Sequence, residues 1–171
     1  MSDDTVSIHH HWRIKTLALR LTDGRQSPTA LKIQRGVCRL MAGLGQVSVT
    51  ELTLASGRRA DVVALSPAGE ITIVEVKSSL ADFRADTKWR DYHAFSDYLL
   101  FAVADDFPIE VLPEDAGLIV ADAYGAAILR KPERTPLAAA RRKAVTIRFA
   151  QAAAARLHSL TDPDGAPSAL L

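Results

Sequence analysis

The sequence of 171 residues contains one cysteine, Cys38, and no apolar run that approaches the roughly 20 residues of a membrane-spanning helix. A single cysteine excludes a disulfide framework and favours a reducing compartment. The first residues, Met-Ser-Asp-Asp, lack the basic start that is typical of a signal peptide. We therefore expect a cytoplasmic protein without a membrane span.

The sequence also lacks the motifs of several common enzyme classes. No glycine-rich phosphate loop, no Cys/His zinc spacing and no Ser/His/Asp arrangement rises above chance. Interpretation of the chain as an ATPase, a zinc protein or a triad hydrolase is therefore weak.

The net charge of +1 conceals an uneven distribution of charge along the chain. Residues 1–47 contain 7 basic and 3 acidic side chains, residues 48–130 contain 7 and 14, and residues 131–160 contain 7 and 1. This distribution is typical of a protein whose acidic centre binds a metal ion while its basic flanks bind the phosphates of a nucleic acid. Five of the central acids are expected to be only solvated surface: Asp82, Asp86, Asp91, Asp105 and Asp106.

Two acids and a lysine stand in neighbouring predicted strands of this acidic centre. Asp61 begins one apolar run, and Glu75 and Lys77 end the next one. Alternate residues of a strand share a face, so Glu75 and Lys77 point the same way. If residues 66–70 form a five-residue hairpin loop, Asp61 lies opposite Glu75 on that face. A register slip of one residue would move Asp61 to the other face.

A further acid, Glu51, joins this group if residues 55–57 form a three-residue loop with Gly57 in the left-handed conformation. That register places Glu51 opposite Asp61. Four polar side chains would then gather at one end of one sheet face.

Carboxylates arranged in this way can hold Mg²⁺ or Mn²⁺, and a lysine on the same face can orient the attacking water. We predict that Asp61, Glu75 and the backbone carbonyl of Val76 hold the metal, with Glu51 as an additional catalytic and metal-binding candidate and Lys77 as a catalytic residue. The alternative is that Glu-Val-Lys forms the polar edge of an amphipathic strand. The strand 71–77 is apolar on both faces, and charges rarely lie in such a strand without partners or a metal.

This pattern resembles the PD-(D/E)xK nuclease signature, with Ala60 in place of the proline. Three segments, 50–61, 86–92 and 117–125, resemble the MmcB family of DNA-repair proteins more specifically, and the similarity extends from about Asp23 to Lys131. The resemblance implies a restriction-endonuclease-like fold and a nucleic-acid substrate. The spacing of the residues alone implies only a phosphate ester or a metal.

One departure from related nucleases concerns the helix before the sheet, which often carries a glutamate. The helix predicted from Ser27 to Gly43 contains none, and Gln34 is its nearest polar substitute. Lys88 and Tyr92 are similar to the Gln-x-x-x-Tyr element of some of these nucleases and would lie one turn apart on a helix. Tyr92 is equally well interpreted as a packing residue. Arg58, Arg59, Gln34, Lys88 and Tyr92 form the predicted substrate-binding set.

The predicted fold is α/β: a mixed central sheet of the restriction-endonuclease-like kind, flanked by helices, with an added C-terminal helix. Helices are expected from Ser27 to Gly43 and over 80–95 and 137–160; strands are expected over 47–54, 59–65, 71–77, 98–104, 117–121 and 126–129.

We divide the chain into three parts. Residues 1–26 form an N-terminal arm, partly mobile, with the tail-like His9–His11 and a weak strand pattern at 17–21. Residues 27–131 form the nuclease-like core. Residues 132–171 form a basic C-terminal helix and a flexible tail.

The resulting hypothesis is a DNA-repair protein that hydrolyses DNA phosphodiesters with Mg²⁺ or Mn²⁺. One alternative is an inactive nuclease-like module that binds damaged or branched DNA through residues such as Arg141 and Arg142 and recruits repair partners. Another is a metal-dependent phosphoesterase that acts on a small nucleotide. A homodimer with contacts through Trp12 or Trp89 stays open.

Overall fold

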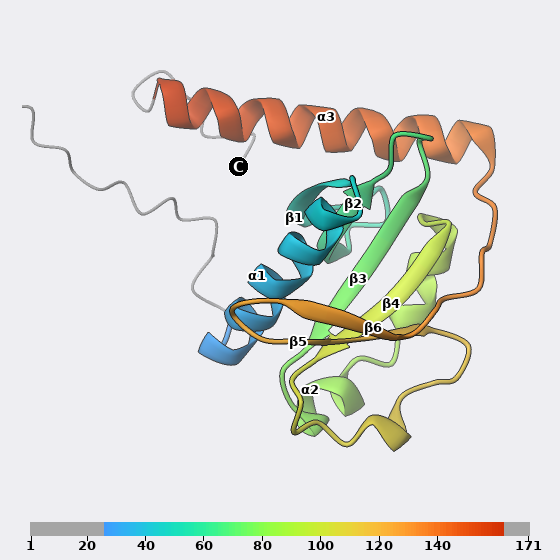
Figure 1. Cartoon of the computed structure of the whole chain (residues 1–171). Helices are drawn as coiled ribbons and strands as arrows, with labels where there is room; N and C mark the ends of the chain where they lie inside the picture. Colours follow the sequence, from blue (N-terminus) through green and yellow to red (C-terminus); the bar gives the residue numbers. More distant parts are fainter. Residues whose placement is uncertain (1–25, 163–171) are drawn as a thin grey trace, which may run out of the picture.

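The computed structural model describes residues 26–162, which form one six-stranded sheet in the order β1-β2-β3-β4-β5-β6. The strands are β1 (Val47–Thr53), β2 (Arg59–Leu65), β3 (Ile71–Lys77), β4 (Tyr98–Val103), β5 (Gly117–Ala121) and β6 (Ala126–Arg130). The α-helices are α1 (Pro28–Gly43), α2 (Leu80–Ala85) and α3 (Ala139–Thr161), and two short 3₁₀ helices are η1 (Trp89–Ala94) and η2 (Ile109–Val111). Figure 1 shows α1 along the sheet and α3 across its β1–β2 end.

The sheet is mixed, as predicted. β1, β2 and β3 form an antiparallel meander, β3, β4 and β5 run parallel, and β6 returns antiparallel to β5. Parallel neighbours need a crossover, and the segments with α2, η1 and η2 supply it. The predicted α/β fold with a flanked mixed sheet and an added C-terminal helix is confirmed.

Both hairpins of the meander have the predicted loops. Ser66 and Glu70 close the second loop, where Gly69 has φ +78°, and Leu65 pairs with Ile71. The first loop turns at Gly57, which has φ +81°. Positive φ is inexpensive only for glycine, so these two residues fix the register of the strands that carry the candidate site.

Helix α1 begins where the sequence predicts. Ser27 is the N-cap, and its hydroxyl accepts a hydrogen bond from the Ala30 amide at 3.1 Å, while Pro28 occupies the first turn. Ile33, Val37 and Met41 are buried against one face of the sheet together with alternate residues of β2, β3, β4 and β5. Apolar residues at helical spacing therefore fix which face of α1 meets the sheet.

The other face of the sheet carries the larger hydrophobic cluster. It includes Ile73, Phe101, Trp89 and, from α3, Val145 and Phe149. Trp89 is 4% exposed and its ring lies edge-on to Phe101 at 5.2 Å. Trp89 is thus a core residue, so its ring is not exposed for the dimer contact that the sequence left open.

The helix predicted over 80–95 is interrupted. It consists of α2 and η1, separated at residues 86–88. The Asp86 carboxylate accepts a hydrogen bond from the Lys88 amide at 3.2 Å, so this side chain competes with helical backbone pairing. Lys88 and Tyr92 consequently do not lie one turn apart on an α-helix.

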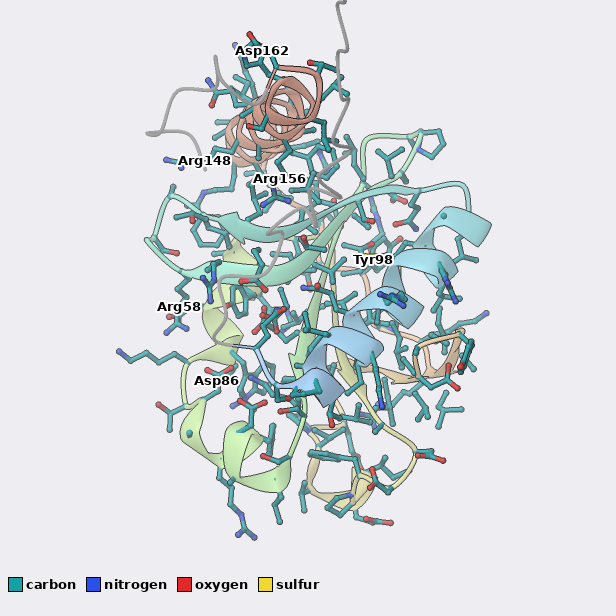
Figure 2. The ribbon with its side chains drawn as sticks, turned by 90° about the vertical axis from the view of Figure 1, so that its left-hand side faces the viewer. Arg58, Asp86, Tyr98, Arg148, Arg156 and Asp162 are labelled. Carbon is teal, nitrogen blue, oxygen red and sulfur yellow. The ribbon has the colours of Figure 1, made fainter. Side chains whose placement is uncertain are left out.

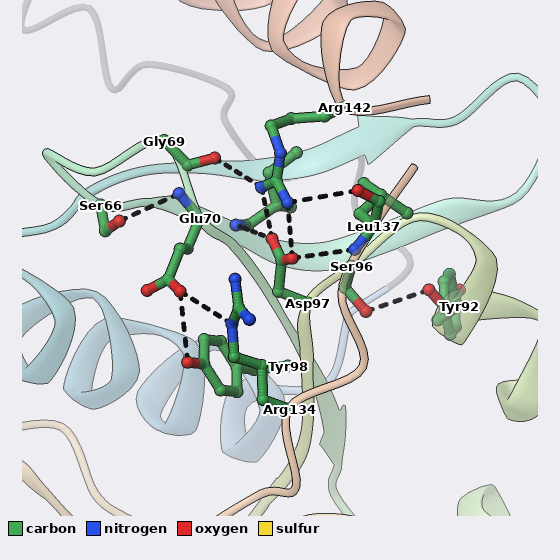
Figure 3. A network of polar contacts seen from close by, with 11 residues as sticks. Ser66, Gly69, Glu70, Tyr92, Ser96, Asp97, Tyr98, Arg134, Leu137 and Arg142 are labelled. Atoms are coloured by element: carbon green, nitrogen blue, oxygen red, sulfur yellow. Dashed lines mark hydrogen bonds and ion pairs between the residues drawn. The ribbon is translucent and has the colours of Figure 1, made fainter. Parts of the chain in front are cut away.

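A buried carboxylate, Asp97, anchors α3 to the sheet (Figure 3). Its oxygens accept hydrogen bonds from the amides of Ile71 and Leu137 and from both Nη atoms of Arg142, at 2.6 to 3.0 Å. Arg141 donates to the Ala94 carbonyl. Arg142 is therefore a structural residue, which corrects the expectation that it is free to bind DNA.

Within residues 26–162, no helix is long and apolar enough to cross a membrane. The predictions for Trp12, for His9–His11 and for the strand at 17–21 fall outside the described residues. The predicted C-terminal tail also falls outside them beyond Asp162.

Candidate metal centre

The candidate site lies where β2 and β3 separate. Their pairing ends at Val62 and Val74. One residue further, the Asp61 carboxylate accepts a hydrogen bond from the Val76 amide at 2.7 Å, and the Asp61 amide lies 3.4 Å from Glu75 Oε1. A side chain thus replaces the next main-chain pairing of the ladder and brings Asp61 and Glu75 together, as the predicted register requires.

Both carboxylates are shielded from water, Glu75 almost fully and Asp61 in part. Glu75 is 4% exposed, and burial, followed by the neighbouring charge of Asp61, raises its pKa well above the ordinary value. Burial also raises the pKa of Asp61 to about 6, against the opposing hydrogen bond from Val76. Two neighbouring desolvated carboxylates resist simultaneous ionisation unless a cation lies nearby.

The third member of the predicted set, Lys77, is 4% exposed. Its Nζ atom lies 2.6 Å from the Asp86 carboxylate, at the end of α2. The interpretation of Asp86 as merely solvated surface is therefore wrong. The sequence offered a weak signal, since an acid that interrupts a predicted helix just after the lysine strand is well placed to fold back onto it.

Glu51 lies near Asp61 but does not form a three-carboxylate cluster with Asp61 and Glu75. Its backbone has φ +51°, which is rare for a residue other than glycine, and Arg59 Nε lies 2.6 Å from its carboxylate. Its charge contributes to the raised pKa of Asp61. Across residues 26–162, no group of three or more His, Cys, Asp or Glu side chains is placed to hold one metal ion.

Gln34 reaches the site from α1, as expected of the residue in the place of the missing glutamate. It is buried, and its amide nitrogen lies 3.3 Å from the Asp61 carbonyl and 3.4 Å from Glu51 Oε1. Gln26 also donates to the Glu51 carboxylate. The helix thus meets the site through neutral donors, where a glutamate would bring charge.

The remaining predicted substrate-binding residues line one edge of the molecule. Arg58 forms an ion pair with Asp91 at 2.9 Å, and Figure 2 shows Arg58 and Asp86 on the same side. Tyr92 is 4% exposed and donates through its hydroxyl to the Arg59 carbonyl at 3.0 Å, and burial raises its pKa. Asp91 is exposed, as predicted, and its ion pair with Arg58 lies at the surface. Lys88 is exposed.

The donor set fits a hard divalent cation. Asp61 and Glu75 offer carboxylate oxygens on neighbouring strands, and their mutual repulsion would be relieved by positive charge. Cys38 lies on α1 and packs with the opposite cluster, so its thiol does not contribute to the site.

Comparisons with known proteins give the following. A family model described as DNA repair protein MmcB-like matches residues 18–164. A solved structure, the SPO1766 protein of unknown function from Silicibacter pomeroyi, is 45% identical, with a TM-score of 0.81; the match covers 85% of this chain and 99% of that one. The comparison with curated proteins finds no match.

Proposed function

Since the chain belongs to the MmcB-like family of DNA-repair proteins, we propose that it is a metal-dependent deoxyribonuclease whose site is built on Asp61, Glu75 and Lys77. The family is the one that the sequence motifs indicated. The observation that carries the proposal is the pair of carboxylates at the separation of β2 and β3, of which Glu75 is buried and Asp61 partly buried, with the buried Lys77 two residues beyond Glu75 on the same strand.

Asp61 and Glu75 would hold Mg²⁺ or Mn²⁺, together with the main-chain carbonyl of Val76. When bound, the cation would supply Lewis-acid polarisation of the scissile phosphate. The Val76 amide keeps one Asp61 oxygen fixed, so the carboxylate is oriented before any ligand arrives. Burial strengthens each charge interaction in the site by excluding water.

Lys77 has two roles in this proposal. Its ammonium donates a hydrogen bond that orients the attacking water, and its charge opposes the negative charge that develops on the phosphorus oxygens. Asp86 holds Nζ at 2.6 Å and so restricts the rotamers of the lysine. The lysine therefore has a defined position before substrate binds.

The test is cleavage of end-labelled single-stranded, duplex and flapped DNA in Mg²⁺ or Mn²⁺ by the native chain and by Glu75→Gln and Lys77→Met. We expect each substitution to lower the cleavage rate at least 100-fold, on the order of the loss of one preorganised electrostatic group. Glu110→Gln, which changes an exposed glutamate in η2, is the matched control and should cleave normally. Equal cleavage by all four proteins would refute the proposal.

The second candidate function is DNA recognition without cleavage. Two observations favour it: Gln34 brings no carboxylate from α1, and Lys77 is already engaged by Asp86. In this case the same substrates are bound but remain uncut, and Glu75→Gln leaves the affinity unchanged or improves it, because a buried negative charge is removed.

A further inference from the structure

The turn between β5 and β6 presents an exposed aromatic ring on a fixed backbone. Tyr124 is 84% exposed, the largest exposed fraction among the exposed large apolar and aromatic side chains of the described residues. The Asp122 carboxylate accepts hydrogen bonds from the amides of Tyr124 and Gly125 at 2.7 and 2.9 Å. Arg39 donates to the carbonyls of Ala123 and Tyr124 at 2.9 and 3.0 Å.

The same turn is packed tightly against α1. At Gly36 a Cβ atom would lie 2.3 Å from the Asp122 carbonyl oxygen and 2.4 Å from that of Gly125, so only glycine allows this approach. Figure 1 shows the β5–β6 hairpin beside α1. The turn is therefore rigid although its side chain is exposed, which lowers the entropy cost of any contact that the ring makes.

The outer face of α1 beside this turn is cationic. Lys32, Arg35 and Arg39 are exposed and follow each other at three- and four-residue spacing, so they share one face of the helix. The sequence of α1 contains no acidic residue. Within residues 26–162, neither Lys32 nor Arg35 forms an ion pair with a carboxylate.

A hollow of about 540 Å³ adjoins the ring. Its lining includes Tyr124, Gly125, Val120 and the two acids Asp105 and Asp122. Most of its exposed wall is apolar, which suits a planar ring system, and the Asp122 carboxylate is directed to the amides of Tyr124 and Gly125.

These features lie at the same end of the sheet as the candidate metal centre. In the register of the sheet, Lys77 of β3 is paired with Val103 of β4, and Val103 is paired with Val120 of β5. The β5–β6 turn therefore begins just beyond the position of Lys77 along the strands. α1 touches both regions, through Gln34 at Asp61 and through Gly36 at the turn. The side chains of Glu75 and Lys77 lie on the sheet face opposite α1, because they alternate with Val74 and Val76, which pack against α1. A strand of DNA bound along α1 would therefore reach the metal centre around this end of the sheet.

We infer that Tyr124 and the cationic face of α1 (Lys32, Arg35 and Arg39) bind single-stranded DNA, with the Tyr124 ring stacked on an unpaired base and the cations on the flanking phosphates. This inference rests on the proposed function and deepens it: the substrate has at least one unpaired nucleotide. Single strands are recognised in this way because every base has a π face and every nucleotide carries a phosphate. A duplex without free bases offers only the phosphates.

The first test measures the affinity of the full chain for a fluorescein-labelled oligothymidine of about 20 nucleotides and for a blunt duplex of the same length, in EDTA. Tyr124→Ala should weaken oligothymidine binding by about tenfold, within the range for loss of one base stack, and leave duplex binding unchanged. Tyr124→Phe keeps the ring and should bind as the native chain does. Equal affinities of the native chain and Tyr124→Ala would overturn the inference.

The cationic face is tested separately by salt dependence. Lys32→Ala and Arg35→Ala should each reduce the slope of log affinity against log salt by about 0.7 for the single strand. Lys131→Ala, an exposed lysine outside this face, is the control. Unchanged slopes for both α1 variants would contradict the assignment of the phosphates to this helix.

Contact of the ring with a base is tested by photo-crosslinking. An oligonucleotide that carries 5-iododeoxyuridine should form an adduct at Tyr124, identified by mass spectrometry, and an adduct only elsewhere would refute the stacking. Failure of this inference is distinguishable from failure of the nuclease proposal. Cleavage that needs Glu75 but not Tyr124 refutes only the inference, whereas Tyr124-dependent binding by a chain that never cleaves refutes only the nuclease.

Discussion

Asp61 is the single residue on which the site depends most, because its carboxylate replaces a main-chain pairing and is at the same time partly desolvated. Its folded pKa of about 6 exceeds the unfolded value of about 4. The protonated form is therefore favoured by folding. Stability from this source is fully present below about pH 4 and is lost as pH rises through 6.

Asp61→Asn should consequently stabilise the chain in EDTA at pH 7 by about 2 kcal/mol, since the amide oxygen can still accept the bond from Val76. The gain should vanish below pH 4, where the native carboxyl is neutral in both states. Urea unfolding at a series of pH values measures this, with exposed Asp106→Asn as control. A variant that is less stable than the native chain at pH 7 would contradict the assigned burial penalty.

At the scale of elements, the ion pair between Arg142 and the buried Asp97 fixes the start of α3 to the sheet, in addition to the apolar packing of that helix. Asp97 is 1% exposed, and the hydrogen bonds from Arg142, Ile71 and Leu137 lower its pKa to about 2 in spite of burial. A lowered folded pKa gives stability that is present above the unfolded pKa of about 4 and is lost as pH falls toward 2. The native chain should lose about 2 to 3 kcal/mol over this interval from Asp97 alone.

Asp97→Asn should remove this stability at neutral pH, because Arg142 loses its charged partner. The NH₂ group of the asparagine would also face N–H donors, from which it cannot accept a hydrogen bond. The variant should be about 2 to 3 kcal/mol less stable at pH 7, and the difference from the native chain should shrink toward pH 2. Circular dichroism during urea titration measures both. A difference that stays constant with pH would show that the ion pair is not its source.

The whole molecule should respond to metal through its folding equilibrium. A cation that binds only the folded chain stabilises it by about 2.7 kcal/mol at 100 times its dissociation constant. We expect Mn²⁺ to raise the Tm of the native chain by several degrees and to leave that of Glu75→Gln unchanged. Calorimetry with Mn²⁺ and EDTA checks this without any assay of activity. The same rise in both proteins would place the metal elsewhere.

Much of the molecule was predictable from local patterns. The Ser27 cap, the Gly57 and Gly69 turns and the apolar alternation of the meander are short-range features, so the register that brings Asp61 to Glu75 followed from them. The metal-dependent chemistry of Asp61, Glu75 and Lys77 was predicted from the same residues, and it stays a prediction until cleavage is measured.

The features that were missed depend on contacts far apart in the sequence. The bond of Asp97 to Arg142 spans 45 residues, and no local pattern shows that an acid before β4 will meet a C-terminal helix. The ion pair of Asp86 with Lys77 and the packing of the Tyr124 turn against α1 depend similarly on which element folds over which. The positive φ of Glu51 is a tertiary effect too, because propensity alone would give that residue ordinary strand geometry.

The position of α3 has a consequence for how the chain reaches this structure. Val145 and Phe149, near the end of the described residues, pack in the same cluster as Val49 and Leu52 of β1. During synthesis the first strand is complete long before its final neighbours exist, so an apolar face of the nascent sheet stays uncovered until the last helix emerges. Sequence-distant contacts of this kind slow folding relative to a helical bundle of equal length, and an apolar face that stays uncovered in this interval is prone to aggregation.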